Sequence, residues 1–477
     1  MKVTRRSFAA LAAKAAAAAC SLPILTAMSR AIPSRTRRPN IIYILADDLG
    51  YGDLGCYGQR KIRTPQIDRM AAEGMRFTDH YAGSAVCAPS RCCLVTGMHA
   101  GHARIRNNAD VPLQPGDPSI AAVLRDAGYA AAVIGKWGLG EAETTGAPWH
   151  KGFDYFYGFL DQTHAHGHYP SYLFRNADRI EIEANKGGKR GAYANDLFTD
   201  EAASFIEKNS AKPFFLYLAY TIPHAELLVP EDSMKEYEDL GWPEKPFPGG
   251  HYAAQPKPNA ARAGMITRLD RDVGRLLALL RTLGIEDETL VIFASDNGPA
   301  PGAGGTDPAF FNSSGPLRGT KFNLYEGGTR VPFIARWPGR IKAGSTCALP
   351  SAFWDMLPTF ADLAGTAAPP CDGISFAPAL LGMEGQKEHP YLYWELGGKQ
   401  AVRMGQWKAV RQGVDKPIEL YDLAGDIGEQ HDVAKDHADV VAQMGKLLQE
   451  AHRDDPNWPL VPKPKPAKSV ANGATDL

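Results

Sequence analysis

Two pairs of oxygen-bearing side chains each follow an apolar run of this sequence: Asp47 with Asp48, and Asp296 with Asn297. Carboxylate and amide oxygens are ligands for hard cations such as Ca²⁺ or Mg²⁺ rather than for soft metals. A single pair of this kind more often caps a turn or a helix. Two pairs, each at the end of an apolar run, favour a metal site.

The segment 87–91, Cys-Ala-Pro-Ser-Arg, places a thiol close to an arginine. By itself the segment fits a buried structural cysteine in a loop as well as a functional one. The chain has seven cysteines, an odd number, and no CxxC pair. A disulfide framework, a zinc ribbon and a thioredoxin-like motif are therefore not expected.

The apolar runs that precede the polar pairs are short and continuous, which is typical of parallel strands covered on both faces. Such runs occupy residues 40–46, 130–134, 214–219 and 290–295. Helical patterns alternate with them at residues 64–73, 119–127 and 263–283. The alternation predicts an α/β fold with a large mixed, mostly parallel sheet sandwiched by helices. Ligands of such sheets bind beyond the carboxyl ends of the strands, so the polar clusters are expected to converge on one site.

Composition excludes several classes of protein. The 52 Lys and Arg residues nearly balance 53 Asp and Glu residues, while 44% of residues are hydrophobic and 22% are charged. These values are ordinary for a soluble globular protein and exclude a disordered chain or a polytopic membrane protein. The small net charge provides no reason to expect a nucleic-acid partner.

Four parts of the chain differ in pattern. Arg5 and Arg6, with the Ala/Leu-rich stretch after them, favour a twin-arginine export signal over residues 1–31, and the stretch is too short to span a membrane. Cys20, after an alanine run, is an alternative lipoprotein attachment site. The remaining parts are a large α/β domain at 38–384, a small α+β domain of short antiparallel strands plus one helix at 385–460, and a loose tail at 461–477.

Several motifs of the chain resemble, in the same order, those of the type I sulfatases, formylglycine-dependent enzymes of the alkaline phosphatase-like superfamily. Segment 87–91 matches the C-x-P-S-R signature, whose cysteine is oxidised after translation to formylglycine. The other matching segments are residues 39–53, 64–77, 94–97, 135–137, 295–298, 321–332 and 420–423. Several ordered motifs are far more specific than one, and together they span roughly residues 38–435.

The resemblance implies a sulfatase whose catalytic domain is residues 38–384. Cys87, as hydrated formylglycine, would attack the sulfur of a sulfate ester, and Arg91 would hold its oxygen. The resemblance also implies a bound Ca²⁺, or Mg²⁺ in its place, that neutralises charge in the transition state. Its ligands would be Asp47, Asp48, Asp296, Asn297 and residue 87.

Three further roles follow from the resemblance. Lys136 and Lys321 would contact the sulfate oxygens, and His224 would protonate the leaving oxygen. Any one of them alone would more often be a surface residue. The implied partners are a sulfate ester, expected to be a sulfated saccharide, a formylglycine-generating maturation enzyme and the twin-arginine export machinery, which together predict an exported, periplasmic enzyme.

One position departs from the family pattern. The usual Gly-Lys-Trp-His-Leu-Gly segment has glycine at position 138 in place of histidine. Because that histidine normally assists sulfate release, another base is expected to replace it. We consider His164 and His166 the candidates, because three histidines within five residues are unusual on a predicted loop, although the loop could equally bind substrate or face solvent.

Two alternative functions remain open at this point. A phosphonate or phosphodiester hydrolase could use the same scaffold. A catalytically inactive protein could retain the pocket to bind sulfated glycans, and Gly138 is the feature that favours this alternative. The intact Cys87, Arg91, lysines and metal-ligand pairs favour an active sulfatase.

Overall fold

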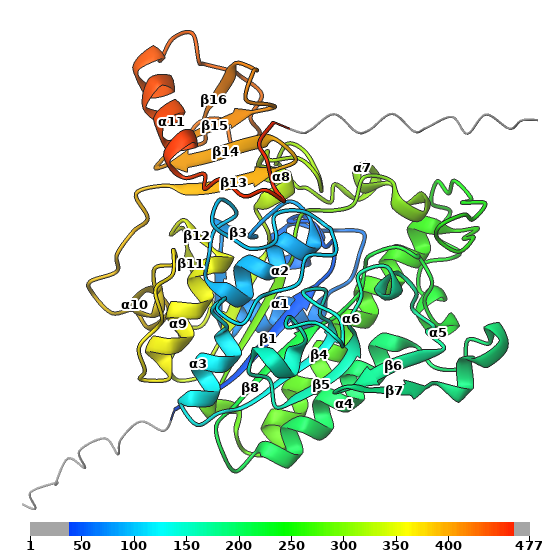
Figure 1. Cartoon of the computed structure of the whole chain (residues 1–477). Coiled ribbons are helices and arrows are strands. Elements are labelled where there is room, and N and C mark those ends of the chain that lie inside the picture. The colour runs from blue at the N-terminus through cyan, green and yellow to red at the C-terminus, as the bar shows by residue number, and fades with distance from the viewer. Residues whose placement is uncertain (1–37, 462–477) are drawn as a thin grey trace, which may run out of the picture. The chain divides into compact units, whose positions relative to one another are not determined.

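The structure, a computed structural model, describes residues 38–461 (Figure 1). The predicted export signal at residues 1–31 and Cys20 lie outside the described residues, as does the tail from residue 462 onward. Within the part of the chain that the structure describes, no helix is both long and apolar enough to cross a membrane.

Within residues 38–461, ten strands form the main sheet, in the order β11-β2-β10-β9-β1-β8-β4-β5-β6-β7. They are β1 (Asn40–Ala46), β2 (Met75–Phe77), β4 (Ala130–Lys136), β5 (Tyr155–Phe159), β6 (Tyr172–Arg175), β7 (Asp178–Glu181), β8 (Phe214–Ala219), β9 (Thr289–Ser295), β10 (Phe333–Arg336) and β11 (Ser345–Cys347). Strands β9, β1, β8, β4 and β5 form a continuous parallel block, and β10 pairs antiparallel with β9. The predicted mixed, mostly parallel sheet is confirmed. A separate pair consists of β3 (His80–Tyr81) and β12 (Ser351–Ala352).

Strand β1 lies at the centre of the main sheet, and all of its residues are buried. Its alternate side chains enter different apolar cores: Tyr43 and Leu45 belong to one, and Ile42 and Ile44 to the other. Burial on both faces explains why this strand is a continuous apolar run rather than an alternating one.

Helices cover both faces of the main sheet (Figure 1). One core includes residues of α2 (Cys87–Thr96), α3 (Ile120–Asp126) and α9 (Met356–Leu363), and the other includes residues of α1 (Pro65–Ala72), α4 (Ala194–Asn209) and α6 (Pro258–Thr282). The three predicted helices correspond to α1, α3 and α6. Helix α6 begins at residue 258 instead of 263, because proline is well suited to a first helical position. The short helices are α5 (Glu231–Met234), α7 (Pro308–Phe311), α8 (Glu326–Thr329) and α10 (Ala377–Leu381).

A smaller antiparallel sheet follows in the last part of the described chain. Its strands, in sequential order, are β13 (Leu392–Leu396), β14 (Lys399–Met404), β15 (Trp407–Arg411) and β16 (Ile418–Asp422). Helix α11 (Ala438–Glu450) packs on this sheet, and Met444 and Leu448 join Tyr393, Val402 and Leu420 in one apolar cluster. The small sheet with one helix agrees with the predicted fold class, while the exact domain boundary near residue 385 stays a prediction.

Candidate active site

The candidate residues extend from the carboxyl ends of four neighbouring strands. Strands β9, β1, β8 and β4 are adjacent and parallel, so their last residues lie at one edge of the sheet. In register, Ala46 of β1 pairs with Ser295 of β9. Asp47 and Asp48 follow β1, Asp296 and Asn297 follow β9, His224 lies in the loop after β8, and Lys136 ends β4. The predicted convergence of these side chains on one edge is what the fold produces.

A sharp turn at Asp48 connects the segments that follow β1 and β9. Asp48 has a φ of 64°, a left-handed conformation that costs a non-glycine residue roughly 1–3 kcal/mol. Its backbone N–H donates to Asp296 Oδ1 at 3.1 Å, and the N–H of Leu49 donates to Ser295 Oγ at 3.0 Å. These bonds hold the strained turn, so two consecutive carboxylates are available at the same edge.

Two buried lysines each pair with one carboxylate of this turn. Lys136 Nζ lies 2.7 Å from Asp47 Oδ2, and Lys321 Nζ lies 2.8 Å from Asp48 Oδ1. All four side chains are buried. Buried charges remain ionised only when they are paired in this way.

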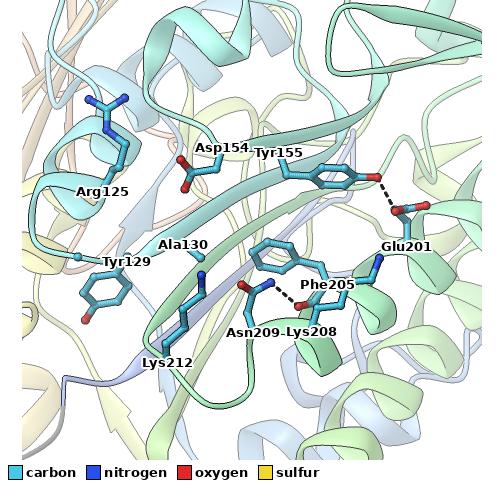
Figure 2. A pocket seen from close by; sticks show the side chains of 11 residues that line it. Arg125, Tyr129, Ala130, Asp154, Tyr155, Glu201, Phe205, Lys208, Asn209 and Lys212 are labelled. Atoms are coloured by element: carbon cyan, nitrogen blue, oxygen red, sulfur yellow. Dashed lines mark hydrogen bonds between the residues drawn. The ribbon is translucent and has the colours of Figure 1, made fainter.

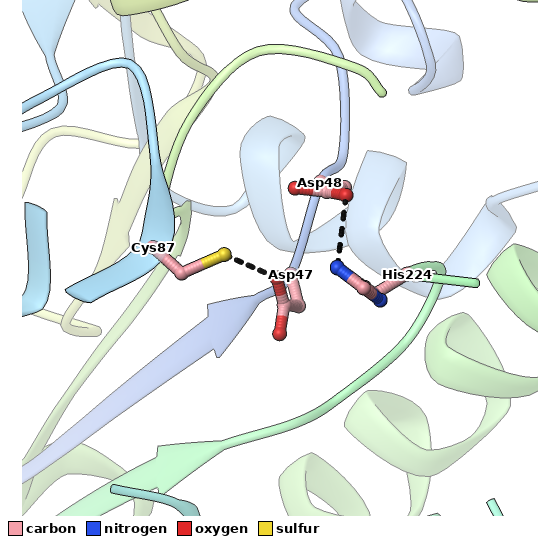
Figure 3. A group of neighbouring side chains, drawn as sticks. All are labelled: Asp47, Asp48, Cys87 and His224. Carbon is pink, nitrogen blue, oxygen red and sulfur yellow. Dashed lines mark hydrogen bonds and ion pairs between the residues drawn. The ribbon is translucent and has the colours of Figure 1, made fainter. Parts of the chain in front are cut away.

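Cys87 is the first residue of α2, and its thiol points at the same centre (Figure 3). The sulfur lies 3.4 Å from Asp47 Oδ1 and 3.4 Å from Lys321 Nζ. Arg91, one turn later on the helix, donates from Nε to Asp296 Oδ2 at 3.0 Å. We call the six charged residues Asp47, Asp48, Arg91, Lys136, Asp296 and Lys321 the central cluster.

His224 stands beside Asp48 at the rim of the central cluster (Figure 3). Its Nε2 lies 3.5 Å from Asp48 Oδ2, and its Nδ1 contacts the carbonyl oxygen of Ala225. Burial, opposed by Asp48 and reinforced by Lys321, lowers the pKa of His224 to about 4. The imidazole is therefore neutral at neutral pH, and the ring is oriented by a backbone acceptor.

The carboxylates of the central cluster affect one another. Burial and the charge of Asp47 raise the pKa of Asp296 to about 6. Burial alone would also raise the pKa of Asp47, but Lys136 and the other nearby cations lower it well below its usual value. Burial, together with Asp47, raises the pKa of the Cys87 thiol to about 12. The three carboxylates of the central cluster thus lie close together, and the charges of Arg91, Lys136 and Lys321 balance theirs.

The donor atoms of this site fit a hard cation. Asn297 donates from Nδ2 to Asp48 Oδ1 at 2.7 Å, while its buried Oδ1 has no hydrogen-bond partner within residues 38–461. A buried unpaired oxygen is costly, and a cation would satisfy it. One ligand atom from each of four residues also falls within 4.8 Å of the others: Asp47, Asp48, Cys87 and His224. That group includes His224, which was not predicted as a ligand, and omits Asp296 and Asn297, so the predicted ligand set stays a prediction.

A second group, His99, His102 and Asp372, has similar spacing but different chemistry. His102 Nδ1 lies 2.9 Å from Asp372 Oδ1, and His99 Nδ1 accepts the N–H of Gly101 at 3.1 Å. A neutral imidazole that accepts at Nδ1 carries its proton on Nε2 and has no second lone pair for a metal. This group is better explained as a structural hydrogen-bond network.

Gln162 occupies the space above Gly138, where the family pattern has histidine. A Cβ at position 138 would lie 1.9 Å from Gln162 Nε2, and the φ of Gly138 is +74°. The backbone conformation at position 138 therefore disfavours any side chain, and a side chain there would also require Gln162 to move. The sequence analysis missed Gln162, since a lone glutamine on a loop carries no signal.

The two histidines proposed as replacement bases lie elsewhere. The His164 ring packs on Tyr172, with ring centroids 4.2 Å apart, and against Phe159. The His166 ring stacks on His224 instead, at 4.7 Å and an interplanar angle of 13°. His166 thus lies beside the site, whereas the nearest atoms to a side chain at position 138 belong to Gln162. The proposed roles of His164 and His166 as bases stay predictions.

Two residues that the sequence analysis did not single out also lie here. His251 Nε2 is 2.9 Å from His166 Nδ1, and the Tyr252 ring lies 6.1 Å from that of His224. The two histidines are 85 positions apart in the sequence, so no local sequence signal marks this contact.

A cavity of about 490 Å³ lies at the opposite ends of the strands (Figure 2). It is lined by Ala130 and Tyr155, the first residues of β4 and β5, and by Phe205 and Lys208 near the end of α4. Tyr155 donates to Glu201 at 2.5 Å on one side of the cavity. Because the candidate residues extend from the carboxyl ends of the strands, this cavity is separate from the active site.

Comparisons with known proteins agree with this geometry. A family model described as Sulfatase matches residues 39–366, and one described as N-sulphoglucosamine sulphohydrolase, C-terminal, matches residues 320–454. The chain is 30% identical to an N-acetylgalactosamine-6-O-sulfatase of Bacteroides thetaiotaomicron over 499 aligned positions, which cover 87% of this chain and 93% of that protein. It is 32% identical to human arylsulfatase A, with 87% of each chain covered.

A solved structure gives the same result. The crystal structure of Ps i-CgsB in complex with k-i-k-neocarrahexaose superposes with a TM-score of 0.74 at 30% identity, covering 87% of this chain and 92% of that one. The family model covers well over half of the chain, and the relatives are matched along most of their length. This chain belongs to the sulfatase family and is a sulfuric ester hydrolase.

Proposed function

We propose that this sulfatase hydrolyses sulfate esters of saccharides, with formylglycine at position 87 and a divalent cation, Ca²⁺ or alternatively Mg²⁺. The observation that carries the proposal is the central cluster, which surrounds the Cys87 sulfur with three carboxylates and three cations. Asp47, Asp48, Asp296 and Asn297 would hold the cation, together with residue 87. When present, the cation and the hydrated aldehyde supply positive charge for the sulfate and a hydroxyl nucleophile for its sulfur.

The positions of the two lysines of the central cluster support a role in binding the sulfate group. Lys321 Nζ is 3.4 Å from the Cys87 sulfur, and Lys136 Nζ reaches the carboxylate that also contacts this sulfur. A sulfate oxygen near residue 87 would therefore meet two fixed ammonium groups, which stabilise charge without reorganisation. Arg91 is fully buried and holds Asp296 at 2.9 Å, so its role is to orient the site around residue 87.

The position of His224 supports a role in giving a proton to the leaving oxygen. Its Nδ1 faces the Ala225 carbonyl, which leaves Nε2 directed at the reacting side of the site, 3.5 Å from Asp48. In the neutral ring Nδ1 donates to that carbonyl and Nε2 carries a lone pair, so His224 would first take up a second proton on Nε2. Because its pKa is lowered, the resulting imidazolium would be a strong donor for an alkoxide as its bond to sulfur breaks.

The relatives support a saccharide as the natural substrate. One relative is an N-acetylgalactosamine-6-O-sulfatase, and a structural neighbour binds k-i-k-neocarrahexaose. Both proteins cover most of this chain at 30% identity. We extend this substrate class to the present enzyme, without assigning the sugar or the position of its sulfate.

The predicted route of maturation and export belongs to the same proposal. Residues 1–31 carry Arg5-Arg6 and would direct a folded protein to the twin-arginine machinery, with Cys20 as an alternative lipid attachment site. A formylglycine-generating enzyme would act on segment 87–91 before export. The mature enzyme would then be periplasmic, which the N-terminal sequence of the exported protein tests.

Mass spectrometry of the peptide that contains Cys87, from protein made in its native host, tests the proposed nucleophile. We expect an aldehyde in place of the thiol. An unmodified thiol in mature, active protein would overturn the mechanism. An unmodified thiol in protein that binds a sulfate ester without hydrolysing it would favour the glycan-binding alternative.

A pair of substrates with one leaving group separates the sulfatase from a phosphoesterase. We expect kcat/KM for 4-nitrophenyl sulfate to exceed that for the phosphate and phosphonate analogues. A larger kcat/KM for the phosphorus esters would assign the main activity to the alternative reaction.

A further inference from the structure

Three loops meet beside His224 and are tied together by hydrogen bonds. The backbone N–H of Glu226 donates to the His166 carbonyl at 3.0 Å, and Gln255 Nε2 donates to the Leu227 carbonyl at 2.6 Å. Gln255 also closes a hairpin, because its backbone exchanges hydrogen bonds of 3.0 and 2.8 Å with Phe247. The three loops are residues 164–168, 221–228 and 247–255.

The hairpin carries His251 and Tyr252 just after Gly249 and Gly250, whose φ values of +100° and +152° permit the tight tip. The His251 and His166 rings are joined edge to edge by the 2.9 Å contact between Nε2 and Nδ1. Tyr252 packs edge-on against both rings, with centroid distances of 4.8 Å to His251 and 5.6 Å to His166.

We call the rings of His166, His251 and Tyr252 the ring row. The row extends from solvent to the side of His224. His251 is exposed, while His166 and Tyr252 are half-buried. His166 stacks on His224, whose Nε2 lies 3.5 Å from Asp48. The row therefore begins one ring away from the group proposed to protonate the leaving oxygen.

Three polar atoms of the row are available to a ligand. His166 Nε2, His251 Nδ1 and the Tyr252 hydroxyl have no hydrogen-bond partner among residues 38–461. The contacts of the three side chains are with other rings of the same region, and none is an ion pair within those residues. Imidazole and phenol edges bind hydroxyl groups, and their faces pack on the apolar face of a sugar ring.

We infer that His166, His251 and Tyr252 form the subsite for the sugar ring that carries the scissile sulfate, and that they recognise its uncharged, hydroxyl-bearing part. The inference rests on the proposed function and specifies where its saccharide binds. Nothing in the row is suited to a second sulfate, because the subsite presents no ammonium or guanidinium group of its own. The subsite selects for a saccharide over a small aryl ester.

Substitutions in the hairpin test the subsite through substrate preference. The variants are His251→Ala and Tyr252→Phe. Each is assayed with 4-nitrophenyl sulfate and with one saccharide, chosen as the one of N-acetylgalactosamine 6-sulfate, glucosamine 6-sulfate and galactose 4-sulfate for which the wild type has the highest kcat/KM. We expect each variant to raise KM for the saccharide roughly 10-fold or more with kcat changed less, since the ring binds equally in ground and transition states. The loss in kcat/KM for the saccharide should exceed the loss for the aryl ester by at least about tenfold.

Conservative and distant variants serve as controls. His251→Gln can still reach His166 Nδ1 and should recover part of the saccharide KM. His431→Ala replaces an exposed residue near the small C-terminal sheet and should leave KM and kcat unchanged for both substrates. Thermal melting of each variant excludes a folding defect as the cause of a loss.

The outcomes separate the inference from the proposed function. An equal loss of kcat/KM on both substrates, or no loss on either, would overturn the subsite but leave the enzyme a saccharide sulfatase. A wild-type enzyme that hydrolyses the aryl ester but none of the saccharides would overturn the proposed substrate class, and the subsite with it.

Discussion

Two buried groups of charges in this molecule both combine carboxylates with lysine and arginine, but they differ in what those charges surround. The central cluster lies at the carboxyl ends of the main sheet strands. The second group lies where the main sheet region contacts the small C-terminal sheet. It consists of Glu326, Arg330, Arg403, Lys408 and Glu429, and we call it the interface cluster.

The carboxylate at the centre of the interface cluster is saturated by partners. Glu326 Oε1 lies 2.7 Å from Lys408 Nζ, and Oε2 accepts from Arg330 at 2.5 Å and from the Tyr81 hydroxyl at 2.7 Å. The two cations come from different parts of the chain: Arg330 directly follows α8, and Lys408 belongs to β15. The interface cluster therefore joins two parts of the fold.

The central cluster is arranged differently. Its carboxylates face one another closely enough that Asp47 contributes to a raised pKa of Asp296, and the buried Oδ1 of Asn297 has no partner in the described part of the chain. Its cations hold the carboxylates near a reactive residue rather than joining two elements. The interface cluster has a similar oxygen, because the buried Glu429 Oε1 also has no hydrogen-bond partner within the described residues, and Glu326 contributes to a raised pKa of Glu429. The comparison therefore teaches that burial, pairing and crowded carboxylates do not by themselves identify a reactive site, and that the distinguishing feature of the central cluster is the Cys87 thiol that its charges surround.

Removing the nucleophile should give the largest effect in the central cluster. Cys87→Ala should lower kcat/KM for a sulfate ester by roughly 10⁴-fold or more, as expected for loss of a covalent catalyst. The unfolding free energy should change little, because the substitution removes one small side chain. Steady-state turnover and thermal melting measure the two effects. Cys371→Ala, a partly exposed cysteine elsewhere, is the matched control, and activity of Cys87→Ala close to wild type would contradict the assignment.

Removing a predicted ligand should abolish the response to cations. For the wild type, a saturating divalent cation at about 100 times its Kd should stabilise the fold by about 2.7 kcal/mol, and a chelator should reverse this. Asp296→Asn should lose that response. Its kcat should also fall roughly 10³-fold, because the cation would no longer stabilise charge in the transition state. Asp372→Asn, in the structural network with His102, should retain both. A cation-induced shift in melting temperature that persists in Asp296→Asn would remove this residue from the ligand set.

Breaking the interface cluster should lower the free energy of unfolding but have little effect on kcat. Lys408→Met leaves Glu326 without its 2.7 Å partner and should destabilise the fold by about 3–5 kcal/mol, the usual effect of removing one member of a buried pair. The kcat of the molecules that remain folded should stay within a few-fold of wild type. Denaturant unfolding and active-site titration measure these quantities. The double variant Lys408→Met/Glu326→Gln should recover part of the stability, and a loss of kcat as large as that of Asp296→Asn would erase the contrast between the clusters.

The smallest predicted effect is a pH dependence within the interface cluster. Burial, with the charge of Glu326 and despite Lys408, raises the pKa of Glu429 to about 7. The unfolded chain then releases this proton at lower pH than the folded chain, so the contribution to stability decreases as pH rises from about 4.5 to about 7 and is constant above that. A pKa difference of this size corresponds to at most about 3 kcal/mol of unfolding free energy. Glu429→Gln should remove this component from the unfolding free energy measured across the range, and an identical pH profile in both proteins would contradict it.

The local pattern of the sequence was sufficient for much of the fold. Short apolar runs predicted four central strands because burial on both faces requires continuous apolar residues, as in β1 and β9. Polar residues directly after those runs predicted a shared site, since parallel strands place their carboxyl ends at one edge. The starts of helices were less well predicted, as for α6, because the residues before a regular apolar pattern can still continue the helix.

What the sequence alone determined was the identity of the strands, the order of the motifs and the residue types at the reacting centre. These properties reside in consecutive residues, where burial periodicity and motif spacing act locally. Only the tertiary structure decided that Gln162 fills the space above Gly138, that His251 meets His166 across 85 positions, and that Lys408 reaches Glu326. Those contacts depend on how loops close and on how the small sheet packs against the main one, and side chains far apart in the chain carry no local signal of their partners.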